Sequence, residues 1–184
     1  AIGLSTLAGF RTPENFNFPY LSKSVKDFWR RWHMTLTSWF RDYLFLPLSF
    51  SVSWRITTGK VLLIKTELFI YIIASLVTWF LTGLWHGANY TFLVWGLLHG
   101  FLLILYRIQE KPRKRILKKL KIHRDNIWLS VTEGLLTFLF VVVTWVVFRS
   151  ESVHASIEYI KRMFSSSLFA NPGDLPVKEI AFAF

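Results

Sequence analysis

Two histidines in this sequence have neighbours that suit acid–base chemistry. The first, His86, stands in the run Trp-His-Gly-Ala-Asn-Tyr at residues 85–90, between apolar runs at residues 69–84 and 91–106. An ionisable side chain inside a membrane is costly and is a candidate functional residue by default. A positioned imidazole, with an ordinary pKa of about 6.5, can take the proton of a hydroxyl group that attacks an acyl carbon. His86 is therefore either a general base or a packed histidine bonded to a neighbouring helix, and the residues alone leave both open.

The second histidine, His33, follows a basic and aromatic stretch. Helical periodicity over residues 25–46 places Lys26, Arg30 and His33 on one face and aromatic side chains on another. Such a basic face could attract the phosphates of coenzyme A or phosphopantetheine, because Lys and Arg bind phosphate well. We predict Lys26, Arg30 and Arg31 as contacts for the phosphates of an acyl donor. A solvated face at the membrane interface explains the same pattern more simply.

Three more polar residues near these histidines could take part in the same chemistry. Asn89 and Tyr90 could donate hydrogen bonds to the oxyanion of a tetrahedral intermediate, although a polar helix end at a turn is the simpler explanation. His99 stands between Gly96 and Gly100, at a spacing typical of close helix packing, and is predicted to be a packed residue. The histidines lack the spacing of a metal-binding motif and the sequence has no cysteine, so no metal site is predicted.

The composition indicates that these residues belong to a membrane protein. Of the 184 residues, 53% are hydrophobic, and they form long blocks. Residues 68–84, 90–106 and 127–148 are each about long enough to cross a bilayer. We therefore predict an all-α polytopic membrane protein with an amphipathic helix at the interface, over about residues 24–46, which Ser24 can cap and which Pro47 ends or kinks.

Other segments are expected to connect or extend these helices. Residues 48–60 are mixed in polarity and are predicted to form a loop. The chain starts with an apolar stretch rather than with Met, and another apolar run begins at about residue 180. We expect a fragment of a longer protein, with a further span beginning near that residue.

The net charge of +11 fits a membrane topology. Residues 107–124 carry nine Lys or Arg, and basic loops are retained in the cytoplasm. By alternation, residues 22–60, with seven basic and two acidic residues, are cytoplasmic as well. His33 then approaches from the cytoplasmic side, and His86 lies toward the outer half of the bilayer or in a cavity. Because the basic stretch adjoins spanning helices, lipid is the expected partner and nucleic acid is not.

Several short motifs occur in order along the chain. They are Asn15-Phe16-Asn17-Phe18-Pro19-Tyr20, Phe28-Trp29-Arg30-Arg31-Trp32-His33, Trp39-Phe40-Arg41-Asp42-Tyr43-Leu44, Leu84-Trp85-His86-Gly87-Ala88-Asn89 and Trp145-Val146-Val147-Phe148-Arg149. Together they resemble the membrane-bound O-acyltransferase family, in its bacterial alginate O-acetylation type. One departure is the stretch 49–55, where the family often has a glycine-rich basic segment.

The resemblance implies a helical bundle around a central cavity, of which residues 1–184 would form the C-terminal part. It implies that His86 is catalytic and that His33 is the second signature position. It also implies an enzyme of the bacterial cytoplasmic membrane that uses no bound cofactor. We expect an acyl group, in particular acetyl, to move from a cytoplasmic thioester such as acetyl-CoA to an exported polysaccharide or to an acetyl-carrying partner protein outside.

Two alternatives remain open at this stage. Related D-alanyl transferases of teichoic acid assembly share the fold and use a carrier-protein thioester, and other relatives move long acyl chains. A transporter or channel subunit would instead use the buried histidines and Glu133 to line a proton or solute path. Transport without acyl transfer would identify the second of these alternatives.

Overall fold

The computed structural model describes residues 2–56, 59–61, 64–123 and 125–165, and this part of the chain is mainly helical. Three of its helices are long and apolar enough to cross a membrane: α5 (Thr66–His86), α6 (Tyr90–Lys119) and α7 (Ile127–Arg149). They cover the ranges predicted as spans, and the predicted all-α membrane fold is confirmed. The further span expected from about residue 180 lies outside the described residues.

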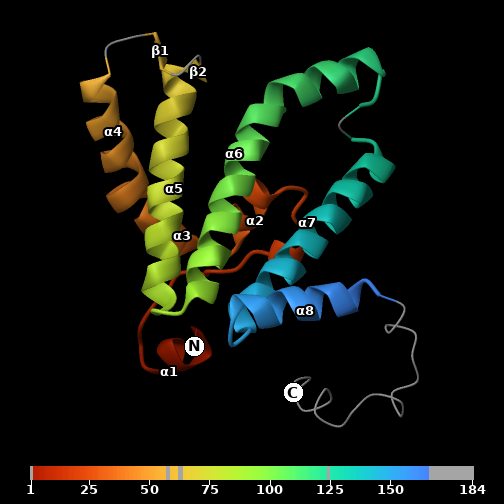
Figure 1. The fold of residues 1–184 in the computed structure, drawn as a ribbon. Coiled ribbons are helices and arrows are strands. Elements are labelled where there is room, and N and C mark those ends of the chain that lie inside the picture. Colours follow the sequence, from red (N-terminus) through yellow and green to blue (C-terminus); the bar gives the residue numbers. More distant parts are fainter. Residues whose placement is uncertain (1, 57–58, 62–63, 124, 166–184) are drawn as a thin grey trace.

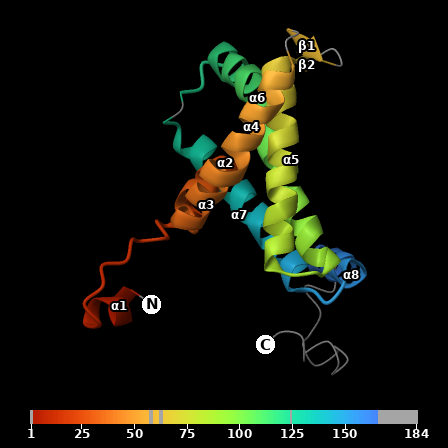
Figure 2. The same cartoon turned by 90° about the vertical axis from the view of Figure 1, so that its left-hand side faces the viewer.

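Helices α5 and α6 form an antiparallel pair that runs side by side in both ribbon views (Figures 1 and 2). Glycines allow the two backbones to approach closely. A side chain at Gly83 would meet the backbone of Phe92, and one at Gly96 would meet the carbonyl oxygen of Trp79. Small residues at such contacts are typical of helix packing inside membranes. The pair is therefore held by backbone fit as well as by side-chain packing.

Helix α7 packs along α6, and α8 (Val153–Met163) lies across its end (Figure 1). An ion pair between Arg113 of α6 and Glu133 of α7 joins the two long helices. Asn126 begins α7 by accepting a hydrogen bond from the backbone nitrogen of Leu129 at 3.2 Å. Many apolar side chains of α7 face outward, including Leu135, which is 64% exposed. Contact with lipid accounts for such exposure on a spanning helix.

The segment predicted as one interfacial helix is divided at His33. It consists of α2 (Val25–Arg31), α3 (Met34–Phe40), the π-helical turn η2 (Arg41–Phe45) and α4 (Leu46–Arg55). Ser24 begins α2 as expected, because its side chain accepts a hydrogen bond from the backbone nitrogen of Asp27 at 3.1 Å. The predicted continuous helix over residues 24–46 is therefore wrong at one point, where the chain turns sharply.

Pro47 lies in the first turn of α4. Proline is tolerated there because the first backbone nitrogens of a helix have no partner within the helix. The helix consequently continues to Arg55, and the predicted loop over residues 48–60 is wrong for residues 48–55. Proline acts here as a helix start rather than as a helix end.

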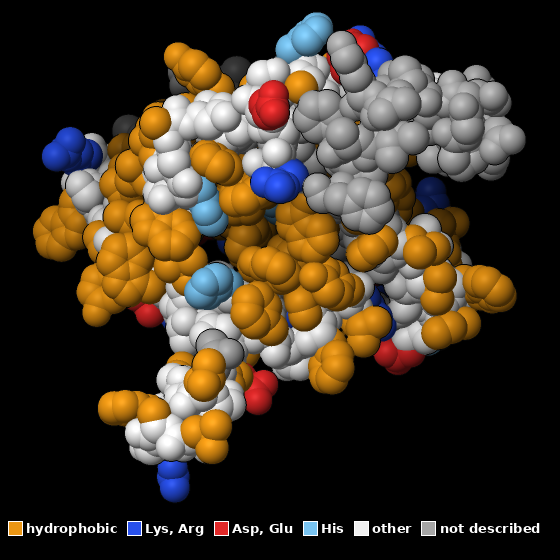
Figure 3. All heavy atoms as spheres, turned by 90° about the horizontal axis from the view of Figure 1, so that it is seen from below, with side chains coloured by type: hydrophobic (Ala, Val, Ile, Leu, Met, Phe, Trp, Pro, Cys, Tyr) orange, Lys and Arg blue, Asp and Glu red, His pale blue; other side chains and the backbone are white. Residues whose placement is uncertain are grey.

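The remaining elements are short. They are α1 (Ile2–Leu7), the 3-10 turn η1 (Pro19–Leu21), and the antiparallel strands β1 (Lys60–Val61) and β2 (Ile64–Lys65). Helix α1 lies apart from the long helices (Figure 2). Seen from the end at which α5 joins α6, hydrophobic side chains cover much of the molecule, and histidines lie among them beside a hollow (Figure 3).

Candidate active site

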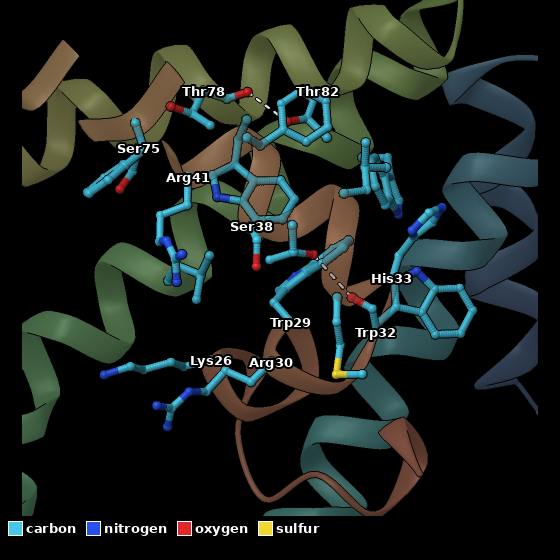
Figure 4. A pocket seen from close by; sticks show the side chains of 18 of the residues that line it. Lys26, Trp29, Arg30, Trp32, His33, Ser38, Arg41, Ser75, Thr78 and Thr82 are labelled. Carbon is cyan, nitrogen blue, oxygen red and sulfur yellow. Dashed lines mark hydrogen bonds between the residues drawn. The ribbon is translucent and has the colours of Figure 1, made fainter. Parts of the chain in front are cut away.

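A cavity of about 700 Å³ is enclosed by the segment from α2 to η2 on one side and by α5, α6 and α7 on the other. Both His33 and His86 line it. The structure therefore brings together the two histidines that the sequence analysis selected. Figure 4 shows His33 at one end of the cavity and Lys26 at another, with hydroxyl side chains of α5 along the opposite wall.

His86 is the last residue of α5 and is half-buried. Its ring lies among aromatic rings, with centroid distances of 5.1 Å to Trp95 and 5.0 Å to Phe148, each meeting it edge to face. In the described part of the chain these ring contacts, and not a polar partner, define its surroundings. The imidazole is thus oriented by packing at the edge of a cavity, which suits a residue that must exchange a proton with a substrate.

His33 occupies an unusual backbone conformation, with φ of 45°. Left-handed conformations are strained for residues other than glycine, and they cluster at functional sites when the surroundings hold them in place. The Nδ1 atom of His33 is buried and has no hydrogen-bond partner among the described residues. The turn between α2 and α3 therefore presents this imidazole to the cavity with one nitrogen uncommitted.

Residues 15–17, which we call the asparagine clasp, hold this turn in place. The backbone nitrogen of Asn17 donates to the carbonyl of Arg31 at 2.9 Å, and that of Met34 donates to the carbonyl of Asn15 at 2.9 Å. The side-chain oxygen of Asn15 also accepts from the backbone nitrogen of Thr35 at 3.0 Å and from its hydroxyl at 2.5 Å. These bonds bracket His33 on both sides and offset the strain of its conformation.

Replacing Asn15 with Ala is expected to lower kcat for the reaction at this site by about 10- to 100-fold, because small displacements of a positioned group can reduce rates that much. Asn15→Asp keeps the acceptor oxygen and should retain most of the activity. Asn17→Ala is the matched control, since Asn17 takes part in the clasp through its backbone. Steady-state kinetics of the intact protein measure these effects. Equal activity of Asn15→Ala and Asn17→Ala would contradict a positioning role for the Asn15 side chain.

The predicted donor-binding cations divide into two groups. Lys26 and Arg30 line the cavity, and the Lys26 ammonium lies 5.9 Å from the centroid of the Tyr106 ring. Arg31 is not among the side chains that line it. Its Nε pairs with Asp27 at 3.1 Å and its Nη1 donates to the carbonyl of Asn17 at 3.4 Å. Arg31 therefore supports the turn rather than the cavity.

Arg41 lines the cavity but was not predicted as a contact for the donor. Its Nε lies 2.8 Å from a carboxylate oxygen of Asp42, and this hydrogen bond holds the pKa of the Asp42 carboxyl below its usual range. Asp42 is therefore the local ion-pair partner of Arg41. Continuous helical periodicity over residues 25–46 already places Arg41 on the face of Lys26, Arg30 and His33, and the structure keeps it on the cavity wall.

A row of hydroxyl side chains on α5 was also missed. Ser75, Thr78 and Thr82 line the cavity, and the spacing continues to His86. Polar residues three or four apart in an otherwise apolar helix share one face, so this spacing could have revealed the row. The hydroxyl of Thr82 donates to the carbonyl of Thr78 at 2.8 Å, whereas the hydroxyl of Thr78 is buried without a partner among the described residues. An unpaired hydroxyl on a cavity wall fits a polar ligand.

The residues predicted for the oxyanion lie elsewhere. Asn89 caps α6, since its side-chain oxygen accepts from the backbone nitrogen of Thr91 at 3.1 Å and its amide donates to the carbonyl of Glu151 at 3.1 Å. Tyr90 is 77% exposed. Neither is among the side chains that line the cavity. The structure therefore supports the simpler explanation for Asn89, a polar residue at a helix end.

His99 is packed in the interior, as the sequence analysis predicted. It is 1% exposed, and its Nδ1 accepts a hydrogen bond from the indole nitrogen of Trp29 at 3.1 Å. The rings of Trp79 and Trp95 lie within 5.6 Å and 4.9 Å of it. This contact anchors α2 to α6 across the cavity wall. Among the described residues there is no group of three or more potential metal ligands.

No family model matches the chain. Among curated proteins, it is 39% identical over 168 residues to a probable alginate O-acetylase of Pseudomonas syringae, and the aligned region covers 90% of this chain and 27% of that protein. It is 36% identical over 154 residues to a teichoic acid D-alanyltransferase of Bacillus subtilis, which covers 84% of this chain and 36% of that protein. It is 33% identical over 164 residues to a peptidoglycan O-acetyltransferase of Helicobacter pylori, which covers 89% and 27%.

These relatives confirm the resemblance to the membrane-bound O-acyltransferase family. They include probable alginate O-acetylases, the type that the motifs resemble. The chain spans about 27% of the length of these alginate O-acetylases.

Proposed function

We propose that this chain is part of a membrane O-acyltransferase that moves an acetyl group from a cytoplasmic thioester donor to hydroxyl groups of an exported polysaccharide. The observation that supports it most is that His33, His86 and the cations of α2 line the same cavity. A bacterial cytoplasmic membrane would supply the donor on one side and the acceptor on the other. An acetyl-carrying protein outside the membrane is the alternative acceptor.

The dimensions of the cavity suit a donor with a long flexible arm. Lys26 lies beside Tyr106 of α6, and the neighbouring Arg107 lies 5.8 Å from the ring of Tyr71 on α5. Since a helix rises about 1.5 Å per residue, Tyr71 and His86 are separated by about 22 Å along α5. An extended phosphopantetheine arm has a comparable length. Cations at one end and His86 at the other would therefore hold the phosphate and the thioester of the same molecule.

His86 is the general base of the proposed reaction. The acceptor hydroxyl oxygen bonds to the thioester carbon while His86 takes the hydroxyl proton. The resulting intermediate collapses, the carbon–sulfur bond breaks, and the departing thiolate receives the proton. This division of labour is ordinary acid–base catalysis of acyl transfer. His33 would position the donor or the acceptor from the opposite wall.

Charge favours acetyl over D-alanyl as the transferred group. The described side chains that line the cavity include Lys26, Arg30 and Arg41 but no carboxylate. A D-alanyl group would bring an ammonium into this basic cavity without an acidic partner, and like charges repel at short range. The teichoic acid D-alanyltransferase among the relatives keeps D-alanyl transfer as the second candidate. A transport path receives less support, because Glu133 pairs with Arg113 and does not line the cavity.

The proposal is tested by offering labelled donors to the purified intact protein in lipid. Labelled acetyl-CoA, a D-alanyl carrier-protein thioester and a long-chain acyl-CoA are compared, each with an acetyl-free polysaccharide present. Transfer of label from acetyl-CoA to the polysaccharide, or to a co-purified partner protein, is the expected result. Label that crosses a liposome membrane without covalent transfer would show a transporter instead.

Neutralising the cations of α2 should weaken donor binding. The double variant Lys26→Gln, Arg30→Gln is expected to raise KM for acetyl-CoA about tenfold or more, since hydrogen bonds to charged groups contribute about 1.5–3 kcal/mol. The kcat should change little, because the proposed contacts of these cations are with the phosphates of the donor and not with the reacting carbonyl. Arg31→Gln is the matched control on the same helix. The effect should disappear with acetyl-pantetheine, which lacks phosphate, and an equal loss with both donors would argue against phosphate recognition.

A further inference from the structure

Trp95 of α6 carries a polar atom without a described partner. Its side chain lines the cavity, and the residue is 5% exposed. Its indole nitrogen is buried and has no acceptor among the described residues. The indole nitrogen of the neighbouring Trp29, in contrast, donates to His99. An indole N–H is a donor only, and leaving a buried donor unpaired is unfavourable, so this atom calls for an explanation.

The position of Trp95 beside His86 explains why its indole nitrogen has no partner within the described part of the protein. Its ring centroid lies 5.1 Å from that of His86, with the two planes at 87°. The turn that joins α5 to α6 brings the two residues together, with His86 just before it and Trp95 in the second turn of α6. An uncommitted hydrogen-bond donor therefore stands next to the candidate general base on the cavity wall. The reaction proposed above develops negative charge on a carbonyl oxygen at this place.

We propose that the indole N–H of Trp95 binds the carbonyl oxygen of the acyl donor and stabilises the negative charge that forms on it. This inference rests on the proposed function. As the acceptor oxygen bonds to the carbonyl carbon, the electron pair of the carbonyl double bond moves to oxygen, and Trp95 donates its hydrogen bond to that oxygen. The double bond re-forms when the carbon–sulfur bond breaks. Trp95 keeps its proton throughout, and His86 carries the proton from the hydroxyl to the thiolate.

The surroundings of Trp95 suit this role. A donor to an oxyanion is most effective when it is fixed before the charge develops, in a site that excludes water. Rings pack around the indole, with centroids 4.9 Å away at His99 and 5.2 Å away at Phe148. Asn89, the amide expected from the sequence, is occupied as a helix cap. Trp95 is thus a pre-positioned donor beside His86.

The test removes the N–H and keeps the ring. Trp95→Phe in the intact protein is expected to lower kcat about 10²- to 10³-fold, as is usual for loss of one oxyanion donor, with KM for the donor changed less than about threefold. Trp85→Phe is the matched control: its ring also lies against His86, at 4.8 Å, but it is not among the cavity-lining side chains. The kcat of that control should stay within about threefold of the wild-type value, because no donor to the oxyanion is removed. Replacing Trp95 with 3-benzothienylalanine, which has sulfur in place of N–H, removes the donor at nearly constant shape.

The outcomes separate the two proposals. Loss of kcat in the benzothienyl variant, with unchanged thermal stability, supports the role of Trp95 even if Trp95→Phe folds poorly. Near-wild-type kcat in the benzothienyl variant, together with an inactive His86→Ala variant, overturns the role of Trp95 and leaves the acyltransferase proposal intact. If the Trp95 side chain only packs against the His86 ring, the benzothienyl variant keeps near-wild-type kcat, and the smaller ring of Trp95→Phe lowers the melting temperature. An active His86→Ala variant overturns both.

Discussion

Replacing His86 with alanine is expected to abolish acyl transfer in the intact protein and to leave its insertion in the membrane unchanged. General bases contribute about 10²- to 10⁴-fold to rates. His33 also lines the cavity, but in the proposed reaction it positions a substrate and does not replace His86 as the base. The ring of His86 is half-buried against aromatic side chains, so its removal enlarges the cavity without breaking a described hydrogen bond. The fold should therefore tolerate the change.

The measurement is transfer of labelled acetyl to polysaccharide by the purified variant, alongside its size-exclusion profile and melting temperature. His154→Ala provides the matched control, because His154 is exposed on α8 and lies outside the cavity. The control should be as active as the wild-type protein. Residual activity above about one tenth of wild type in His86→Ala would be incompatible with a general base, given the size of such effects.

The second large effect is expected from Gly96→Val, which should prevent α5 and α6 from packing. A Cβ at residue 96 would overlap the carbonyl oxygen of Trp79 and would also press on the backbone of Gly83. Backbone atoms cannot rotate away as a flexible side chain can, and overpacking typically destabilises by about 1–3 kcal/mol or more. Because the α5–α6 pair carries His86 and Trp95, activity should be lost together with stability.

A matched control exists within another spanning helix. At Gly134 of α7, an added Cβ would meet no heavy atom of another described element within 4 Å, so Gly134→Val tests the general cost of valine in a spanning helix. The yield of monodisperse protein in detergent and the melting temperature report the difference. Similar values for the two valine variants would show that the close approach at Gly96 is not important for the fold.

Features that depend on local composition were predictable from the sequence. The three spans follow from apolar length alone, and Ser24 marked the start of α2 correctly because a capping side chain acts within one turn. Lys26 and Arg30 were placed on the correct face because they are four residues apart on an unbroken helix. Arg31 lies one residue further around that helix, and it turns to Asp27.

The features that were missed depend on distant partners. Nothing in the residues around His33 marks a break, since neither glycine nor proline is present; the break is held by Asn15, which lies 18 positions earlier in the sequence. The proposed role of Trp95 could not be predicted from the sequence, because it depends on whether each indole nitrogen has a hydrogen-bond acceptor. Only the packed structure distinguishes Trp95, whose indole nitrogen has no described acceptor, from Trp29, which donates to His99.

The turn between α5 and α6 has a consequence for how the protein is made. The residues proposed to act on the thioester, His86 and Trp95, stand nine positions apart on one helical hairpin. Contacts between residues close in sequence form early during folding, because little chain entropy is lost in closing the loop. The reactive end of the cavity can therefore assemble when this hairpin enters the bilayer. Lys26 and Arg30, the proposed donor contacts, reach the cavity only when α2 docks on α6 through Trp29 and His99, so the proposed donor site is complete only after the chain has folded.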